Sequence, residues 1–382
     1  MGKNNDLPAI PALPSGGNWL KSDPKYESNE FVSDADWEEI NSKDGRAKPA
    51  DERLQKALED INKQNEAYRN RKFLFYCRPS NIDLLAQQTR LAGFKGKSQS
   101  GPTMFGSGKP TSNDTTLKDY LEGLEQKRKE GGGIPDEFHT ERKFLTAVRD
   151  QGECRCCAVF ASVAAIETAF LIANPNLDND LHLSEQALLN SARSDDNDHG
   201  CDGTSSLDTY LKSVIEKCGG QLPLAKDVPY KAKQENTDDK TMPDNYDSGV
   251  KVTDYYYFKK ELTDDQMKVL LLKHGSVVVA IQYGDENSHL RNSLRLFGKG
   301  IMDYSAFATP ESGEMMAVTL IGYGIHEGTP FWKIKNSWGS EWGNKGYMKI
   351  KQGRECSAIT KCAMVPIVEQ TLANCVPGRI VQ

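Results

Sequence analysis

An almost uninterrupted apolar run from residue 157 to residue 173, CAVFASVAAIETAFLIA, constrains the fold of this 382-residue chain more than any other segment. Glu167 is its single charged residue, so a helix of this sequence is apolar on every side. Such a helix is expected only where other elements surround it. The run ends at Asn174-Pro175, because proline disfavours helical geometry in the residue before it. We therefore expect one central helix buried inside a folded body.

The pattern along the chain changes from helical to extended after this run. Helices are predicted at 183–192, with Ser184 as N-cap, and at 207–220, with Gly219 as the C-terminal stop. Strands are predicted from β-branched and aromatic runs bounded by Gly- and Asp-rich turns, at 250–258, 276–283, 315–324, 330–338 and 346–351. Helices followed by strands indicate segregated halves, so the predicted fold class is α+β.

The two ends of the chain have a different composition from this folded body. Residues 1–36 are rich in Pro, Gly, Asn and Ser and are predicted to form an extended polar tail. Residues 37–133 contain an amphipathic helix predicted at 50–71, followed by a Gly- and Ser-rich linker. Residues 134–367 form the predicted main domain, and residues 368–382 are a C-terminal extension.

A set of short motifs accompanies the apolar helix and the strands. The first is Asp150-Gln151-Gly152-Glu153-Cys154-Arg155-Cys156-Cys157, which opens the helix. The others, in order, are Leu183-Ser184-Glu185-Gln186, Gly200-Cys201-Asp202-Gly203, Val228-Pro229-Tyr230, Phe297-Gly298-Lys299-Gly300-Ile301, Gly322-Tyr323-Gly324, Asn336-Ser337-Trp338-Gly339, Trp342-Gly343 and Gly346-Tyr347. In this order and at these spacings the motifs resemble those of papain-like cysteine peptidases, over residues 134–367.

The resemblance implies a two-lobed fold, with a helical lobe, a β-barrel-like lobe and the active cleft between them. The region before residue 134 is similar in position to the inhibitory propeptide of that family. The resemblance also implies roles for three residues: Cys157 as nucleophile, Gln151 as the side chain of the oxyanion hole, and Asn336 as the group that orients a catalytic histidine. It pairs Cys154 with Cys201 in a disulfide.

The catalytic histidine of that family is missing from its expected place. It would directly precede the Ala-Val ahead of Ile-Gly-Tyr-Gly, and that position is Met316. A thiol near its ordinary pKa is only a few per cent thiolate at neutral pH, so the imidazole is needed both to form the thiolate and to protonate the leaving amine. A thioether carries no titratable proton. None of the six histidines, His139, His182, His199, His274, His289 and His326, aligns with the wall opposite Cys157, and His199 is the nearest alternative.

Two further departures concern the substrate cleft. Ala158 stands where the family has a tryptophan under the site. Thr204 follows Gly203 where the family has a second glycine, and a β-branched side chain is expected to crowd the strip on which substrate backbone lies. The family residues that persist have alternative explanations: Asn336 and Trp338 could persist because they pack the β-rich lobe, Gln151 as a helix cap, and Cys157 as a small buried apolar residue.

Two functions of different class follow from this pattern. The first is a papain-fold protein without catalysis that acts as a binding or scaffold protein, with protein partners such as a large or cytoskeletal assembly. The second is a divergent cysteine endopeptidase that uses Cys157. No cofactor or metal site is implied, and a net charge of −6 gives no electrostatic case for nucleic acid. The first thirty residues contain no apolar run of signal-peptide length and no segment reaches membrane-spanning length, so we predict a cytoplasmic protein without membrane insertion.

Overall fold

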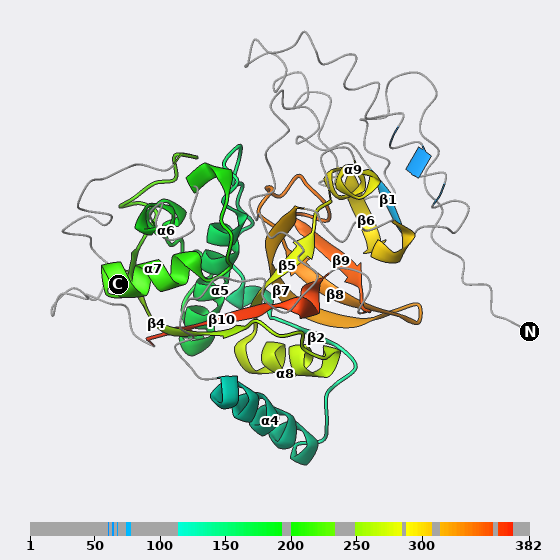
Figure 1. Ribbon diagram of the computed structural model, residues 1–382, viewed down its shortest axis with the longest axis horizontal. Coiled ribbons are helices and arrows are strands. Elements are labelled where there is room, and N and C mark those ends of the chain that lie inside the picture. Colours follow the sequence, from blue (N-terminus) through cyan, green and yellow to red (C-terminus); the bar gives the residue numbers. More distant parts are fainter. Residues whose placement is uncertain are drawn as a thin grey trace, which may run out of the picture.

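The architecture is that of a computed structural model (Figure 1). It describes a short set of N-terminal positions and most of the chain after residue 113. The described residues are 60, 63, 64, 67, 74–77, 114–192, 200–233, 249–284, 288–307, 314–353 and 358–369. The predicted tail and most of the predicted helix at 50–71 lie outside these residues.

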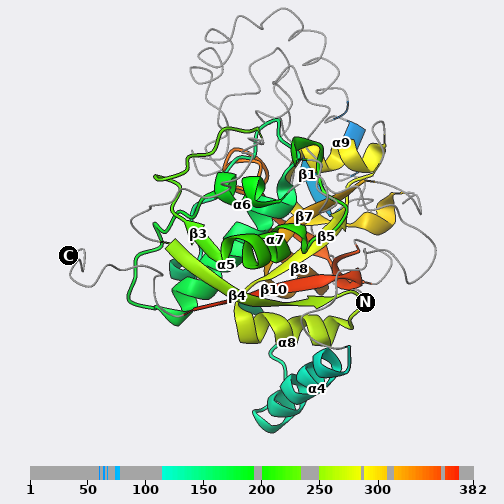
Figure 2. The same ribbon diagram turned by 60° about the vertical axis from the view of Figure 1, so that its left-hand side comes forward.

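The helical lobe consists of three helices around the predicted apolar run. The central helix α5 is Cys157–Ala173, and α6 (Glu185–Ser191) and α7 (Thr209–Cys218) lie on its outer side (Figures 1 and 2). The Ser184 hydroxyl accepts a hydrogen bond from the Ala187 amide at the start of α6. Gly219 ends α7 in the left-handed region, at φ 61°. The predicted span of α5 and the predicted caps Ser184 and Gly219 are confirmed, whereas α6 and α7 are each shorter than the predicted spans by one or two residues at each end.

The second lobe is built on a twisted, mostly antiparallel sheet. The strand order is β1-β6-β9-β8-β7-β5-β10-β4-β3, with β2 paired to β7, and β6 and β9 are parallel. The strands are β1 (Phe75–Cys77), β2 (Phe138–His139), β3 (Gln221–Pro223), β4 (Gly249–Phe258), β5 (Val277–Gln282), β6 (Phe297–Met302), β7 (Met315–His326), β8 (Thr329–Lys335), β9 (Tyr347–Lys351) and β10 (Ala363–Val368). Short 3-10 turns occur at Arg142–Phe144, Gly200–Asp202, Tyr304–Ala306 and Ile359–Lys361.

Two helices interrupt the β-rich lobe that the sequence pattern predicted as strands alone. Helix α8 (Asp264–His274) begins with a capping box, in which Thr263 and Gln266 bond to each other's backbone amides. Helix α9 (His289–Arg295) has Ser288 as N-cap. Both caps are visible in the sequence, but the β-rich segments around them dominated the pattern. The fold class is nevertheless α+β, as predicted.

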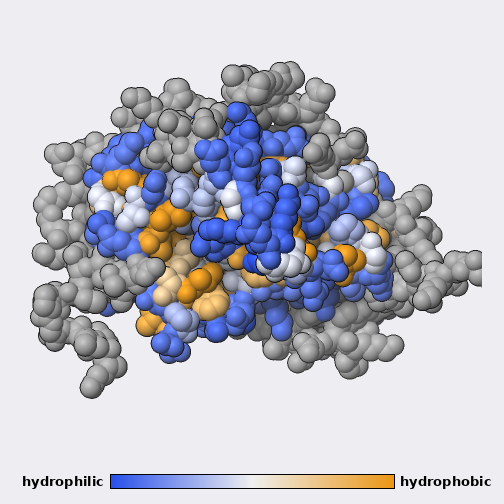
Figure 3. Space-filling view, turned by 90° about the horizontal axis from the view of Figure 1, so that it is seen from below, coloured by the Kyte–Doolittle hydropathy of each residue, from blue (hydrophilic) through white to orange (hydrophobic). Residues whose placement is uncertain are grey.

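Two elements among the described residues ahead of the main domain contact it. Strand β1 pairs antiparallel with β6. Helix α4 (Asp114–Glu130) packs on α8, on the side of the sheet away from the helical lobe's α6 and α7 (Figures 1 and 2). Seen from below, α4 crosses the surface as a hydrophilic ridge, because its apolar side chains Leu117 and Leu121 are turned inward and buried (Figure 3). Among the described residues, no helix combines the length and apolar character that a bilayer crossing requires.

Candidate active site

Cys157 lies at the start of α5, at the junction of the two lobes, and its side chain is buried. The thiol is not disulfide-bonded. Its Sγ accepts a hydrogen bond from the backbone amide of Ala317, at a distance of 3.3 Å. Ala317 belongs to β7, so this contact joins the first residue of the central helix to the central part of the sheet.

That contact also fixes the position of residue 316. The Ala317 amide nitrogen is covalently bonded to the carbonyl carbon of Met316, so the Met316 backbone lies directly beside the Cys157 sulfur. Met316 is fully buried and pairs with Ile281 of β5. The residue at the wall opposite Cys157 is therefore methionine, whose sulfur is at most a weak hydrogen-bond acceptor.

The described histidines lie elsewhere. His139 stacks on Phe331 at a ring separation of 6.1 Å, and His274 contacts the Tyr120 hydroxyl at 2.7 Å. His182 forms a 3.4 Å ion pair with Glu185. His289 and His326 are exposed. His199, which sequence comparison made the nearest alternative base, lies outside the described residues.

Asn336 follows β8 and is buried near the same junction. Its Oδ1 accepts a hydrogen bond from the Ser337 amide at 2.8 Å. Because an N–H group can only donate, this bond fixes which end of the amide faces Ser337. The other end, Nδ2, has no hydrogen-bond partner among the residues that the structure describes. The amide expected to orient a histidine is thus present, and its oxygen, the atom that would accept from an imidazole N–H, bonds to Ser337.

Gln151 is buried where the loop before α5 meets the β-rich lobe. Its Nε2 donates to the Cys154 carbonyl at 2.8 Å, and its Oε1 accepts from the Ser337 hydroxyl at 2.7 Å. The side chain therefore ties the two lobes together beside Cys157. Its role as an oxyanion-hole donor stays a prediction.

Comparison with known proteins places this arrangement in a family. Residues 134–367 match the profile of the papain family cysteine proteases. The chain belongs to that family. The viral cathepsin of Epiphyas postvittana nucleopolyhedrovirus is 33% identical over 222 residues, 58% of this chain and 61% of the relative. The thiol protease aleurain of Arabidopsis thaliana is 33% identical over 231 residues, 60% of this chain and 58% of the relative. The chain thus spans about three fifths of the length of these relatives.

Solved proforms share the fold of this papain-family chain over a longer stretch. A ragweed pollen cysteine protease in its proform superposes with a TM-score of 0.64 at 22% identity, covering 91% of this chain and 99% of the other. Procathepsin L 3 of the Tenebrio molitor larval midgut gives a TM-score of 0.63 at 16% identity, covering 87% and 98%. At these identities the likeness concerns the fold alone. It includes the region ahead of residue 134.

The residues expected to shape the papain-type substrate cleft have other contacts. The Thr204 hydroxyl lies 2.8 Å from that of Thr209 and 3.2 Å from the Ser206 carbonyl, so it is held in the turn before α7. The expected crowding of the substrate strip by this β-branched side chain stays a prediction. Gly203 adopts φ 98°, a conformation that favours glycine. Ala158 is buried in the first turn of α5.

Trp338 was predicted either to line the cleft or to pack the β-rich lobe. It is fully buried, with its ring 5.1 Å from that of Trp342 and 5.8 Å from that of Tyr283, both nearly edge-on. The packing explanation accounts for these contacts. The indole therefore stabilises the lobe on which Asn336 is carried.

Cys154 and Cys201 are joined by a disulfide that links the loop before α5 to the turn before α7. The neighbouring Cys156 is a buried thiol 3.1 Å from the Tyr230 hydroxyl, and burial raises the pKa of this thiol. The Tyr230 hydroxyl donates to the Gln151 carbonyl at 2.8 Å. This tyrosine anchors the loop of Gln151, a role that sequence reasoning missed although the Val-Pro-Tyr motif was noted.

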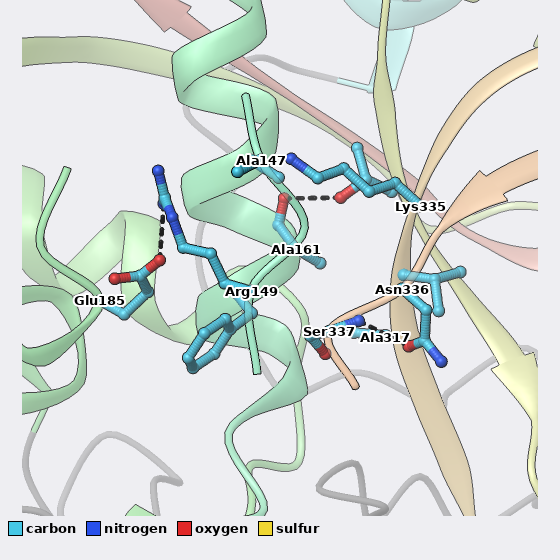
Figure 4. Close-up of a pocket in the computed structure, with 12 residues that line it drawn as sticks. Ala147, Arg149, Ala161, Glu185, Ala317, Lys335, Asn336 and Ser337 are labelled. Carbon is cyan, nitrogen blue, oxygen red and sulfur yellow. Dashed lines mark hydrogen bonds and ion pairs between the residues drawn. The ribbon is translucent and has the colours of Figure 1, made fainter. Parts of the chain in front are cut away.

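A small pocket lies behind the site, between α5, β7 and the segment 335–337 (Figure 4). On one side Arg149 and Glu185 point toward each other, with Arg149 Nη1 2.7 Å from the carboxylate. On the other side Lys335 donates to the Thr146 carbonyl and hydroxyl, at 2.9 and 3.0 Å. Asn336 is at the edge of this pocket. Sequence reasoning missed these charged residues, because each pairing joins segments far apart in the chain.

Proposed function

We propose that this chain is a non-catalytic member of the papain family that acts by binding other proteins. One observation carries the proposal: the Ala317 amide donates to the Cys157 sulfur, so the Met316 backbone lies beside the sulfur, and the papain mechanism would need an imidazole there. Asn336 agrees with it, because its oxygen, the atom that would accept from an imidazole N–H, bonds to the Ser337 amide.

The chemistry of peptide hydrolysis explains why this replacement matters. Without an imidazolium, the start of α5 and the Ala317 amide are among the groups that would favour a Cys157 thiolate. A helix N-terminus contributes at most about 2 kcal/mol, or roughly one and a half pKa units. Burial acts in the opposite direction. The leaving amine would also lack a proton donor. Removing the acid–base group of such a unit costs several orders of magnitude in turnover.

The direct test uses covalent probes and peptide substrates. Full-length protein should react slowly at Cys157 with peptidyl epoxides or vinyl sulfones at pH 6 and should cleave no peptide measurably. Met316→His should raise labelling at least about tenfold, because an imidazolium increases the thiolate fraction. Cleavage should recover little while Ala158 remains. Cys157→Ser is the control for labelling at other thiols. Rapid labelling and turnover by the unmodified protein would refute the proposal.

Binding and scaffolding require partners, and we propose protein partners, with a large assembly such as a cytoskeletal one among them. The main domain presents two structured attachments to the region before it, β1 on β6 and α4 on α8. The test is co-purification of partners from the native source, with the full chain and its Met316→His variant as two matched baits. Recovery of the same partners by both baits shows that binding does not depend on residue 316.

The proposal includes a cytoplasmic location. The Cys154–Cys201 disulfide argues against this location, because disulfides persist in oxidising compartments. Differential alkylation of native material tests it directly. Recovery of Cys154 and Cys201 as thiols supports the cytoplasmic location. Recovery of the intact disulfide contradicts it.

The second candidate is a divergent cysteine endopeptidase. It is favoured by the family itself, in which Cys157, Gln151 and Asn336 all occupy catalytic positions. This function requires another base, for which His199 is the candidate. Under this hypothesis His199→Ala abolishes labelling and cleavage, whereas under the non-catalytic proposal it changes neither.

A further inference from the structure

An ion pair joins the two lobes within two residues of Cys157 and of Met316. Arg155, in the loop before α5, directs Nη2 to both oxygens of the Glu314 carboxylate, at 3.2 and 3.3 Å. Glu314 precedes β7 directly. The pair therefore spans the same gap as the contact between Cys157 and Ala317.

Both ends of this pair are anchored. The Arg155 amide donates to the Cys201 carbonyl at 3.0 Å, and its neighbour Cys154 is disulfide-bonded to Cys201. On the other side, the Glu314 carbonyl accepts from the Tyr283 amide at 2.8 Å. The backbone of each partner is therefore held where its side chain reaches the other across the gap.

A second arginine holds the carboxylate in place. Arg291 of α9 donates from Nη2 to Glu314 Oε2 at 2.7 Å and to the Gly284 carbonyl at 3.0 Å. The Arg291 guanidinium lies 4.6 Å from the centre of the Tyr283 ring. Two guanidinium groups thus converge on one carboxylate, and removal of Arg155 alone would leave Glu314 paired.

The pair lies on the solvent side of the reactive position. The side chains of Arg155 and Glu314 are 13% and 31% exposed, whereas Cys157 and Met316 are 0% exposed. The two charged side chains are therefore nearer to solvent than the sulfur and than residue 316.

We propose that the Arg155–Glu314 ion pair is a latch that closes the cleft, holding its two walls together and excluding an extended peptide from Cys157. The latch acts on access to the cleft, so it does not depend on whether Cys157 has any peptidase activity.

The test compares two thiol reagents on the full chain at pH 9, because a higher pH increases the thiolate fraction of a thiol. Iodoacetamide is small, and a peptidyl epoxide must occupy the cleft. The ratio of their rates at Cys157, followed by tandem mass spectrometry, cancels the intrinsic reactivity of the thiol. Arg155→Ala should raise the peptidyl rate relative to the iodoacetamide rate at least tenfold. Raising salt should increase this ratio two- to threefold in the unmodified protein and leave it unchanged in the variant.

Lys251→Ala is the matched control, because it removes a different ion pair far from Cys157 in the chain. In that pair Lys251 of β4 lies 2.7 Å from the Glu369 carboxylate. The Lys251→Ala substitution should not alter the ratio. Amide hydrogen exchange at Ala317 gives a readout that needs no thiol reactivity, and Arg155→Ala should speed it about tenfold. An unchanged ratio together with unchanged exchange in Arg155→Ala overturns the latch. An equal rise for both reagents also overturns it, because that result indicates general loosening.

Discussion

Two neighbouring places beside the start of α5 differ in how completely their polar groups are bonded. Behind the cleft, Arg149 pairs with Glu167 at 2.8 Å and with Glu185 at 2.7 Å, and Thr146 donates to the other oxygen of Glu167. These pairs join the segment before α5 to the helices α5 and α6. In the cleft, the Asn336 amide nitrogen is buried without a partner among the described residues, and Met316 carries no titratable proton. The charged groups behind the cleft are therefore matched, whereas the amide in the cleft is not.

Lys335 and Asn336 are adjacent in the chain, yet they belong to different places of this comparison. Lys335 belongs to the matched network, with its amine held by Thr146. Burial lowers the pKa of Lys335 to about 8, and the nearby Glu167 acts against this decrease. One residue further along, the amide lacks a partner. The two side chains follow each other at the end of β8, so the difference in their hydrogen bonding arises from their neighbours. Lys335 reaches Thr146, whereas Asn336 Nδ2 reaches no partner among the described residues.

The largest expected effect breaks the matched side of this comparison. Glu167→Ala leaves Arg149 with one carboxylate and removes the acceptor of Thr146 and of the Leu183 amide. Removing one partner of a buried ion pair typically costs about 3–5 kcal/mol, so the free energy of unfolding should fall by this amount. Urea denaturation measures it.

The control for that experiment is Glu122→Ala, which removes an exposed pair with Lys118 on α4 and should cost at most about 0.5 kcal/mol. Comparable losses in the two variants would show that the buried network contributes no more than a surface ion pair.

A smaller effect is expected where α4 meets α8. There the His274 imidazole contacts the Tyr120 hydroxyl, packs edge-on to Tyr256, and neighbours Lys273. Burial, with a further contribution from Lys273, lowers the pKa of His274 from 6.5 to about 4. The unfolded chain then binds the proton more tightly than the folded one. Stability is therefore full above about pH 6.5 and falls as the pH drops towards 4.

Between pH 7 and pH 4.5 this group should cost about 2–3 kcal/mol, an upper figure because the imidazole is partly accessible. His274→Gln retains a hydrogen-bonding side chain but does not titrate. The difference between the two proteins, measured by urea denaturation at both pH values, isolates the histidine from the other titrating groups. If both proteins lose the same stability on acidification, the junction is not pH-sensitive.

The sequence predicted those elements that are determined by residues within the element itself. The apolar run at 157–173 predicted α5, and Ser184 and Gly219 predicted the ends of α6 and α7. Helices α8 and α9 were missed, because short amphipathic helices inside a β-rich stretch contribute less to the pattern than the strands around them. Strand β10 was missed for another reason, since its pairing with β4 and β5 depends on segments more than eighty residues away.

In the candidate site, too, some residues could be predicted from local motifs and others could not. Family motifs identified Cys157, Met316, Asn336 and Gln151 from their places in the chain. The interaction of Arg155 with Glu314 joins residues 159 positions apart, and no pattern in either segment indicates it. The motif assigned the Thr204 side chain to the cleft. The structure shows a hydrogen bond from the Thr204 hydroxyl to the Thr209 hydroxyl, within the turn before α7.

The smallest expected effect tests the unmatched side of the comparison. Asn336→Ala removes a buried donor that has no described partner, which is favourable, and it also removes the acceptor of the Ser337 amide, which is not. These contributions oppose each other, so the free energy of unfolding should change by less than about 1 kcal/mol. Labelling of Cys157 should change less than twofold. In the Met316→His background the same substitution should reverse most of the labelling gain, because the amide then has an imidazole to orient. A tenfold loss of labelling from Asn336→Ala in the otherwise unmodified protein would mean that Asn336 already supports a base, and the non-catalytic proposal would then fail.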